Sequence, residues 1–246
     1  MNDDLWEAQS GWWQARVSDG ADPEYEEQIL PLAAHHLAGA TRVLDIGCGE
    51  GQISRLAVAG GAVFVAGVDV TWGQITVAHE RGGGAAFARA GAVALPFDAG
   101  AFDAVVACLV FEHISQVDVA IAEIARVLRP GGRMLFFLNH PLIQTPDSGW
   151  IDDQILDPPE QYWRIGDYLV EDERVEEIEK GVLIPFIHRP VSRYLNALMD
   201  HGLQLVRMEE PPPPPGFLEL AGEYAAAATI PRLLFLRLER LGTVAR

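Results

Sequence analysis

A chain of 246 residues, 49% of them hydrophobic, is long enough to bury one substantial core in a single domain. Its formal net charge of −17 argues against nucleic acid and anionic membrane surfaces as partners, because both are bound largely through Lys and Arg side chains. No apolar run approaches the ~20 residues of a membrane span, no basic leader precedes an apolar stretch, and only two cysteines are present. A soluble protein of the reducing cytoplasm is therefore expected.

The first 40 residues predict helices ahead of the core. Asp22-Pro23 is typical of a helix start, and apolar residues recur at helical spacing from Ile29 to Leu37. From Thr41 onward short apolar runs alternate with helical stretches, and strands are expected at residues 42–46, 63–68, 85–90, 102–109, 133–139, 203–208 and 232–236. Because such alternation requires crossover connections, it predicts an α/β fold, a three-layer sandwich around a seven-stranded, mostly parallel sheet whose last strand is antiparallel.

Residues 141–190 interrupt this pattern. The segment is too long for a simple connection, and its acidic stretch from Glu171 to Glu179 is typical of a solvated helix face. Its aromatic residues either pack the segment onto the sheet or form an apolar lid that excludes water: Trp150, Tyr162, Trp163, Tyr168 and Phe186. We expect one domain over residues 1–246, with residues 1–40 as a helical cap and residues 141–190 as an insertion or lid over the acceptor site.

A glycine-rich turn follows the first strand: Gly47-Cys48-Gly49-Glu50-Gly51. Glycines here let the chain turn tightly and let a ligand lie against the backbone at the carboxyl ends of the strands. Asp69 ends the second strand, where a carboxylate can accept hydrogen bonds from ribose hydroxyls. A nicotinamide-dinucleotide turn would need glycine at Gln52, and its phosphates would meet acidic neighbours, so the turn favours a ligand with an amino group and a sulfonium.

Five motifs, in chain order, resemble those of class I S-adenosylmethionine-dependent methyltransferases, of the type that act on small molecules. They are Val43-Leu44-Asp45-Ile46-Gly47-Cys48-Gly49-Glu50-Gly51, Ala66-Gly67-Val68-Asp69-Val70, Ala94-Leu95-Pro96-Phe97, Phe102-Asp103-Ala104-Val105 and Arg126-Val127-Leu128-Arg129-Pro130-Gly131-Gly132. The resemblance covers residues 41–140 well and residues 188–210 more loosely. It implies S-adenosyl-L-methionine as the cofactor and S-adenosyl-L-homocysteine as its product.

The resemblance also implies cofactor contacts at particular positions. On the methionine side these are the turn residues, an acidic residue directed toward the amino group, and a backbone position after the fourth strand: Gly47, Cys48, Gly49, Asp45 and Leu109. In the N-terminal helix, Trp12 or Arg16 either touches the methionine carboxylate or serves only in packing.

On the nucleoside side, the resemblance implies that Asp69 binds the ribose and that Val70 packs against the adenine. The backbone N–H of Ala92 would reach the ring. Many relatives carry an acidic residue where this chain has Gly91, so adenine recognition is expected to rest on backbone or water near residues 91–92.

Three histidines follow strands or the insertion at the expected mouth of the sheet: His113, His140 and His188. A methyl transfer to a hydroxyl is helped by a general base, for which histidine is the commonest choice. His140 and His188 are the first candidates, with His113 as the third. A histidine at any one of these positions is more often a structural hydrogen-bonding residue than a base.

The sequence thus predicts methyl transfer from S-adenosylmethionine to a small-molecule acceptor, most readily at oxygen, with nitrogen or carbon as alternatives. A tRNA-modifying methyltransferase is the second reading, which the lack of a basic stripe weakens. A non-catalytic S-adenosylmethionine-binding module or an NAD(P)-binding protein is the third. No cluster of metal ligands is evident in the sequence, so no metal is expected, and the chain is expected to be a monomer or a homodimer.

Overall fold

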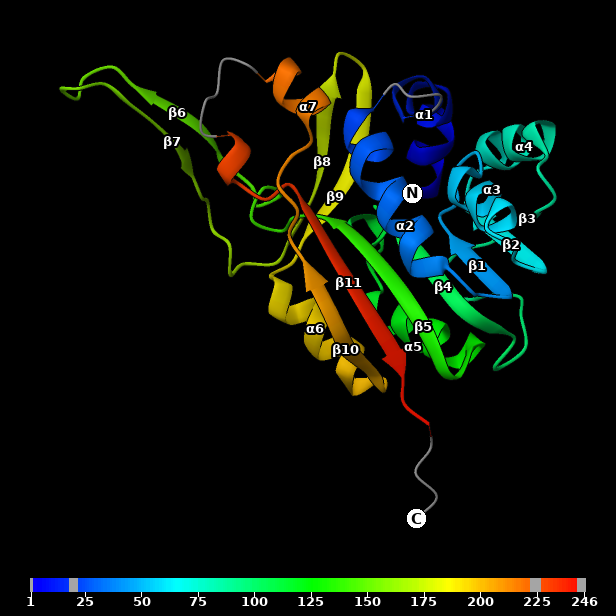
Figure 1. Cartoon of the computed structure of the whole chain (residues 1–246). Helices are drawn as coiled ribbons and strands as arrows, with labels where there is room; N and C mark the ends of the chain where they lie inside the picture. The colour runs from blue at the N-terminus through cyan, green and yellow to red at the C-terminus, as the bar shows by residue number, and fades with distance from the viewer. Residues whose placement is uncertain (1, 18–21, 222–226, 243–246) are drawn as a thin grey trace.

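The computed structural model describes residues 2–17, 22–221 and 227–242, and it centres on a seven-stranded sheet (Figure 1). The strand order is β10-β11-β5-β4-β1-β2-β3. β11 is antiparallel to both of its neighbours, and the other adjacent pairs are parallel, so the predicted fold class is confirmed. The strands are β1 (Arg42–Ile46), β2 (Phe64–Asp69), β3 (Ala86–Arg89), β4 (Phe102–Cys108), β5 (Leu128–Asn139), β10 (Leu203–Glu209) and β11 (Leu233–Arg240).

Helices cover both faces of the sheet and bury its central strands. Alternate residues of β1 and β4 face opposite layers: Val43 and Val106 pack with α2 and α3, whereas Leu44 and Val105 pack with α5 and α6. This two-sided burial explains why the central strands are continuous apolar runs rather than alternating ones. The helices are α2 (Leu30–Leu37), which continues from the π-helical turn η1 (Tyr25–Ile29), α3 (Gln52–Ala59), α4 (Trp72–Arg81), α5 (Val117–Val127) and α6 (Val191–Asp200).

The strand order reverses between β1 and β4. From β1 the chain proceeds outward to β2 and β3, and it then returns to the other side of β1 to form β4. At such a reversal the connections leave in opposite directions, so a crevice opens at the carboxyl ends of the two strands. At the opposite end of the sheet, Asp103 accepts hydrogen bonds from the backbone N–H groups of Thr41 and Arg42, both at 3.1 Å, and ties β1 to β4.

The insertion forms two β-hairpins rather than a helical segment. They are β6 (Gly149–Asp153) with β7 (Glu160–Arg164), and β8 (Asp172–Glu179) with β9 (Val182–His188). The helix expected between Glu171 and Glu179 was wrong, because β9 follows within a few residues and pairs with this segment along its length.

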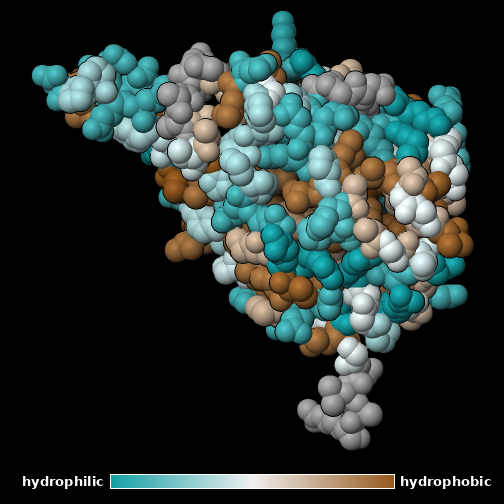
Figure 2. Space-filling model, in the orientation of Figure 1, coloured by the Kyte–Doolittle hydropathy of each residue, from teal (hydrophilic) through white to brown (hydrophobic). Residues whose placement is uncertain are grey.

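The first hairpin does not cover the mouth of the sheet. β6 and β7 project from the body at the upper left of Figure 1, and Figure 2 shows that hydrophilic residues cover most of this arm. Trp150 and Trp163 pack against each other, with ring centroids 5.6 Å apart, and Tyr162 lies on the same arm. These three side chains therefore serve the arm rather than a lid, which corrects the lid interpretation for them. The second hairpin packs against α1 and the 3₁₀ turn η2 (Phe111–His113).

The N-terminal helix α1 (Asn2–Val17) lies against α4 and β9 (Figure 1). Glu7 accepts hydrogen bonds from the backbone N–H groups of Trp72 and Gly73, at 2.7 and 2.9 Å, and so caps the start of α4. Gln14 adds a bond to the Gly73 carbonyl. The remaining short helices are α7 (Pro215–Leu220) and η3 (Ala227–Thr229). None of the described helices has the length and apolar character required to cross a membrane.

Candidate functional site

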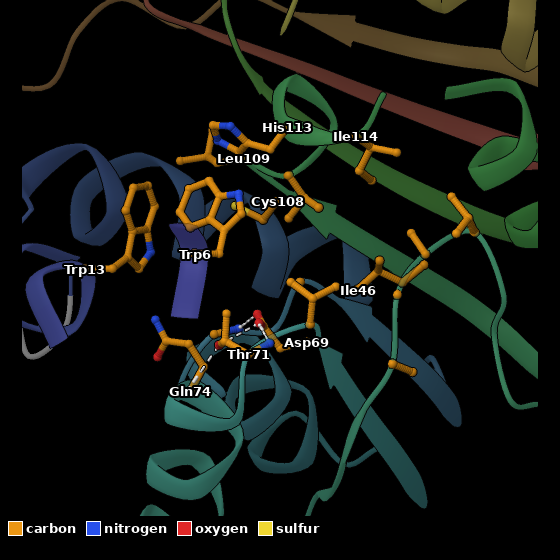
Figure 3. A pocket seen from close by; sticks show the side chains of 18 of the residues that line it. Trp6, Trp13, Ile46, Asp69, Thr71, Gln74, Cys108, Leu109, His113 and Ile114 are labelled. Carbon is orange, nitrogen blue, oxygen red and sulfur yellow. Dashed lines mark hydrogen bonds between the residues drawn. The ribbon is translucent and has the colours of Figure 1, made fainter. Parts of the chain in front are cut away.

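A cavity of about 320 Å³ lies at the carboxyl ends of β1, β2 and β4, in the crevice at the strand reversal (Figure 3). Its volume falls within the range typical of small-molecule sites. Its lining comes from the glycine turn, the ends of β2 and β3, the segment after β4 and the inner face of α1: Trp6, Trp13, Ile46, Gly47, Gly49, Asp69, Val70, Thr71, Gln74, Ala90, Gly91, Ala92, Val93, Cys108, Leu109, Val110, His113, Ile114, Ser115 and Gln116.

The floor of the cavity is bare backbone. Gly47 and Gly49 have φ values of +64° and +53°, a region that side chains with a β-carbon rarely adopt. A Cβ on Gly49 would meet no atom within 4 Å, so this residue leaves open space for a ligand above it. Leu109 also adopts a positive φ, of +54°, and its N–H donates to the Phe137 carbonyl at 3.0 Å. A strained non-glycine residue of this kind is common at functional sites.

Asp69 stands at the end of β2 with its carboxylate turned along the cavity floor. Oδ2 accepts from the Gly49 N–H at 3.0 Å, and Oδ1 accepts from the N–H and the hydroxyl of Thr71, both at 2.9 Å. Burial raises the pKa of Asp69, and the Thr71 hydrogen bonds oppose that rise. Oδ1 thus already accepts two hydrogen bonds, whereas Oδ2 accepts one and keeps lone-pair capacity for a further donor, such as a ligand hydroxyl.

Val70, Gly91 and Ala92 line the same cavity as Asp69. A Cβ on Gly91 would stand 3.6 Å from Val70 Cγ1, which is ordinary van der Waals contact, so these residues adjoin one another and give this part of the lining an apolar surface. The structure therefore brings together the positions that the sequence assigned to the nucleoside side of a cofactor.

Asp45 lies beneath the turn rather than in the cavity. Its side chain is buried, and its Oδ2 accepts from the Ser54 hydroxyl at 2.7 Å, which ties β1 to the first turn of α3. Burial raises the pKa of Asp45 to about 7, although the Ser54 bond opposes this rise. Asp45 is not among the residues that line the cavity, and the Ser54 hydroxyl donates to one of its two carboxylate oxygens.

Cys48 and Leu109 line a smaller recess of about 40 Å³ that adjoins the cavity. Tyr25 of η1 and Trp13 of α1 close this recess from the N-terminal side. Burial raises the pKa values of Tyr25 and of the Cys48 thiol well above their ordinary values, so both groups are neutral. The sequence did not single out Tyr25, which reaches the turn only because η1 packs beside β1.

The N-terminal helix reaches the cavity through different residues from those expected. Trp12 Nε1 donates to Glu179 at 3.0 Å, and Arg16 forms an ion pair with the same carboxylate, on the second hairpin and outside the cavity. Trp6 and Trp13 line the cavity instead. The sequence spacing already indicates this division of the helix. Trp6 and Trp13 are seven residues apart and share one face, whereas Trp12 and Arg16 are four residues apart and share another.

Of the three candidate histidines, only His113 reaches the cavity. Its Nδ1–H donates to the Pro185 carbonyl of β9 at 2.7 Å, and this bond fixes the tautomer, so that Nε2 carries the lone pair. Nε2 is shielded from solvent and has no hydrogen-bond partner among the described residues. Burial lowers the pKa of His113 to about 4, so its imidazole is neutral at physiological pH.

His140 and His188 are held elsewhere. His140 Nε2 bonds to Glu210 at 2.8 Å, and its Nδ1 accepts from the Leu142 N–H at 3.1 Å. His188 Nε2 donates to the Tyr168 carbonyl at 2.8 Å. Neither residue lines the cavity, so the structure places His113, rather than these two, beside the space where a ligand could bind.

Glu112 is a buried acidic residue that the sequence analysis did not single out. Its Oε1 accepts from the side-chain amide of Asn139 at 2.9 Å and joins the turn after β4 to the end of β5. Burial raises the pKa of Glu112 to about 7, with the Asn139 bonds opposing. It precedes His113 directly, so this clamp helps to hold the histidine at the cavity. Among the described residues, no group of three or more His, Cys, Asp or Glu side chains is placed to hold a metal ion.

Known proteins resemble this chain in both sequence and structure. A family described as a methyltransferase domain matches residues 44–136. Demethylmenaquinone methyltransferase from Thermobifida fusca is 32% identical over 163 residues, which cover 60% of this chain and 68% of that protein. 27-O-demethylrifamycin SV methyltransferase from Amycolatopsis mediterranei is 31% identical over 161 residues, which cover 63% of this chain and 50% of that protein.

The structural comparison agrees. An S-adenosylmethionine-dependent methyltransferase from Mesorhizobium loti superposes with a TM-score of 0.75 at 27% identity, over 85% of this chain and 96% of that one. The chain spans about half the length of other curated relatives that it matches, from 47% to 59%. The glycine turn, the carboxylate after β2 and the sheet order define an S-adenosylmethionine-binding fold, and the chain belongs to the class I S-adenosylmethionine-dependent methyltransferases.

Replacing Asp69 with alanine is expected to weaken cofactor binding. The change removes the carboxylate that would accept the ribose hydroxyls, at about 1.5–3 kcal/mol, or roughly 10- to 150-fold in the dissociation constant. The loss of the acceptor for the Gly49 and Thr71 N–H groups should lower the stability of the fold as well. Calorimetric titration with S-adenosylhomocysteine measures the loss of affinity.

Asp103→Asn is the matched control, because Asp103 also accepts hydrogen bonds from backbone N–H groups but at the far end of the sheet. It should lower the unfolding midpoint and leave the affinity unchanged. Equal affinities for wild type and Asp69→Ala would contradict the ribose assignment.

Proposed function

We propose that this protein transfers the methyl group of S-adenosylmethionine to a small-molecule acceptor, with oxygen as the favoured atom. The observation that carries the proposal is the meeting, in one cavity, of a bare glycine floor, the Asp69 carboxylate and the unpartnered Nε2 of His113. The first two suit a nucleoside cofactor, and the third suits the removal of a proton from an acceptor.

The charges around the cavity fit a cationic cofactor. Asp45 and Asp69 both have raised pKa values because burial outweighs the hydrogen bonds to their carboxylates and, for Asp45, the charge of Arg55. A ligand that brings a sulfonium and an ammonium would stabilise the charged forms of these carboxylates. No Lys or Arg is among the described residues that line the cavity, so the phosphates of a nicotinamide dinucleotide would find no counter-charge there. The charges of the residues in and beneath the cavity therefore support S-adenosylmethionine over NAD(P) as the cofactor.

Each part of the cofactor has a matching part of the site. Asp69 would accept the ribose hydroxyls, and Val70 with Gly91 and Ala92 would hold the adenine between apolar walls. Gly47, Gly49 and the strained backbone at Leu109 would flank the methionine portion. When bound, the cofactor supplies an electrophilic methyl group on a sulfonium. The protein orients the acceptor in line with that group and excludes water from it.

His113 supports oxygen as the accepting atom. A hydroxyl is a weak nucleophile until a base takes its proton, and a neutral imidazole with a free lone pair is suited to this step. The names of the relatives include both oxygen and carbon acceptors, such as an O-methyltransferase of Aspergillus nomiae and a ubiquinone/menaquinone C-methyltransferase of Hahella chejuensis. The choice of oxygen therefore depends on His113 rather than on the comparisons.

Two measurements test this proposal. Calorimetry should detect S-adenosylhomocysteine binding to the full chain and no binding of NAD under the same conditions. An assay with methyl-labelled S-adenosylmethionine and fractionated metabolite extracts should then transfer label to a small molecule, and alkaline and acid stability of the product separate ethers from esters and amines. Tight NAD binding without S-adenosylhomocysteine binding would overturn the proposal, and label found only in tRNA would overturn the choice of acceptor.

A further inference from the structure

The Trp6 indole occupies the middle of the cavity. In Figure 3 it stands between His113 above and Asp69 with Thr71 below, and it projects inward from α1. Its ring packs edge-on against His113, with centroids 4.6 Å apart, and edge-on against Trp13, with centroids 5.6 Å apart. The Phe186 ring of β9 lies on His113 as well, at 4.9 Å. The rings of Trp13 and His113 thus contact a position in the cavity that already holds a flat bicyclic ring, the Trp6 indole.

An acceptor must bind at the position beside His113 that the Trp6 indole holds in this structure. A hydroxyl has to come within about 2.6–3.2 Å of a general base to give up its proton. Two rings whose centroids are 4.6 Å apart are in contact, so no third ring fits between Trp6 and His113. An acceptor whose hydroxyl reaches His113 therefore replaces the indole, at least in part.

The chemistry of the walls limits what can enter. Among the described lining residues, Asp69 is the one carboxylate and no Lys or Arg is present. A carboxylate or phosphate on the acceptor would find no cationic side chain among these lining residues and would be buried in the same cavity as the Asp69 carboxylate, which is costly. Edge-on contacts from Trp13 and His113 instead favour a flat aromatic face.

From these contacts we propose that the acceptor is an uncharged, planar aromatic molecule bearing a hydroxyl group, and that its ring displaces the Trp6 indole against His113. This inference rests on the proposed function. In the step itself, the hydroxyl proton passes to His113 Nε2 and the hydroxyl oxygen forms the new bond to the methyl carbon. The bond from that carbon to sulfur breaks, and its electron pair remains on sulfur, which becomes a neutral thioether.

The attachment of α1 allows Trp6 to leave. The helix is held to α4 through Glu7 and Gln14, and to the second hairpin through Trp12 and Arg16. None of these bonds involves the Trp6 side chain. The indole can therefore turn out of the cavity while the helix stays docked, and it covers His113 until an acceptor arrives.

The experiment uses the full chain saturated with S-adenosylhomocysteine and three probes of similar size. 2-Naphthol is planar and uncharged, 2-naphthoate is planar and anionic, and decahydro-2-naphthol is uncharged but not planar. Calorimetry should give the tightest binding for 2-naphthol, with the anion at least about tenfold weaker because its charge is buried unpaired. Trp6→Ala should bind 2-naphthol about tenfold more tightly than wild type, since the competing indole is removed.

Two further variants keep the result interpretable. Trp12→Ala removes an indole of the same helix that does not line the cavity, although it packs beside Trp13 and bonds to Glu179, and it should not reproduce the tighter 2-naphthol binding of Trp6→Ala. Trp6→Phe keeps an aromatic ring of smaller size and should give an intermediate affinity, which guards against a folding defect in the alanine variant. Weaker 2-naphthol binding in both Trp6 variants, equal binding of the anion, or no probe binding at all would overturn the inference. Failure of the proposed function is separate, because it appears earlier as a loss of S-adenosylhomocysteine binding in wild type.

Discussion

His113→Asn is expected to lower kcat by about 10²- to 10⁴-fold, the usual contribution of a positioned general base. Asparagine places its amide nitrogen near the position of Nδ1, so it can still donate to the Pro185 carbonyl while the Nε2 lone pair is lost. The affinity for S-adenosylhomocysteine should stay unchanged, because the ribose and the methionine portion contact other residues. Single-turnover kinetics with labelled cofactor measure the loss in the chemical step.

The pH dependence gives a second check on the same residue. Because burial lowers the pKa of His113 from 6.5 to about 4, its basic form is already present at mildly acidic pH. The profile of kcat/KM should therefore lack a histidine limb near pH 6.5, and the limb that belongs to His113 should fall near pH 4. Burial raises the pKa values of both Glu112 and Asp45 to about 7, so Glu112→Gln and Asp45→Asn identify any limb that either carboxyl group causes.

His140→Asn and His188→Asn are the matched controls for this prediction. Both residues are buried and hydrogen-bonded away from the cavity, so their loss should affect stability more than the chemical step. A large drop in kcat for either variant, with little change for His113→Asn, would exclude His113 as the base and return the choice to the histidines that the sequence favoured.

Gly47→Ala is expected to abolish measurable cofactor binding and to destabilise the fold by about 2–5 kcal/mol, the sum of a strained backbone and an overpacked contact. At φ +64° an L-residue is strained, and the added Cβ would stand 3.0 Å from Val110 Cγ1 and still closer to Cγ2. Val110 or the turn must shift, and the cavity floor moves with it. Denaturant titration and calorimetry with S-adenosylhomocysteine measure the two effects.

Substitutions at two other glycines separate the effect of backbone strain from the effect on the cavity floor. Gly39 has a φ of +75° with no atom near its would-be Cβ, so Gly39→Ala should cost about 1 kcal/mol of stability and leave binding intact. Gly49→Ala places the new methyl group in open cavity space, so it should weaken binding more than it weakens the fold. If Gly47→Ala binds the cofactor as wild type does, the turn is not the cofactor floor.

Much of the core of this fold was readable from the sequence, because local patterns determine it. The strand from residues 42 to 46 and the one from 102 to 108 are apolar runs buried on both faces, and glycines after the first strand permit the positive φ values that the tight turn requires. Asp69 was located by its place at the end of a strand, since parallel strands bring their carboxyl ends to one edge. Val70 and Leu109 followed from the resemblance to the methyltransferase family.

The residues that close the site were harder to assign, because long-range packing decides them. Helix α1 was expected, but which of its faces meets the cavity depends on Glu7 capping α4 and on Glu179 of β8. The insertion was read as partly helical, although it pairs with itself as hairpins. His113 was ranked third among the candidate bases. Its Nδ1 bonds to the Pro185 carbonyl, which leaves the lone pair on Nε2, and this partner lies 72 residues away in the sequence.

The residues of α1 that line the cavity are not part of the core on which folding depends. None of its described side chains belongs to the two large apolar clusters on either face of the sheet, yet Trp6 and Trp13 form a wall of the cavity. Substitutions on this inner face can therefore reshape the chamber while the folding equilibrium is nearly untouched. Libraries that diversify residues 6 and 13 are consequently a low-risk route to new acceptors, since most members should still fold.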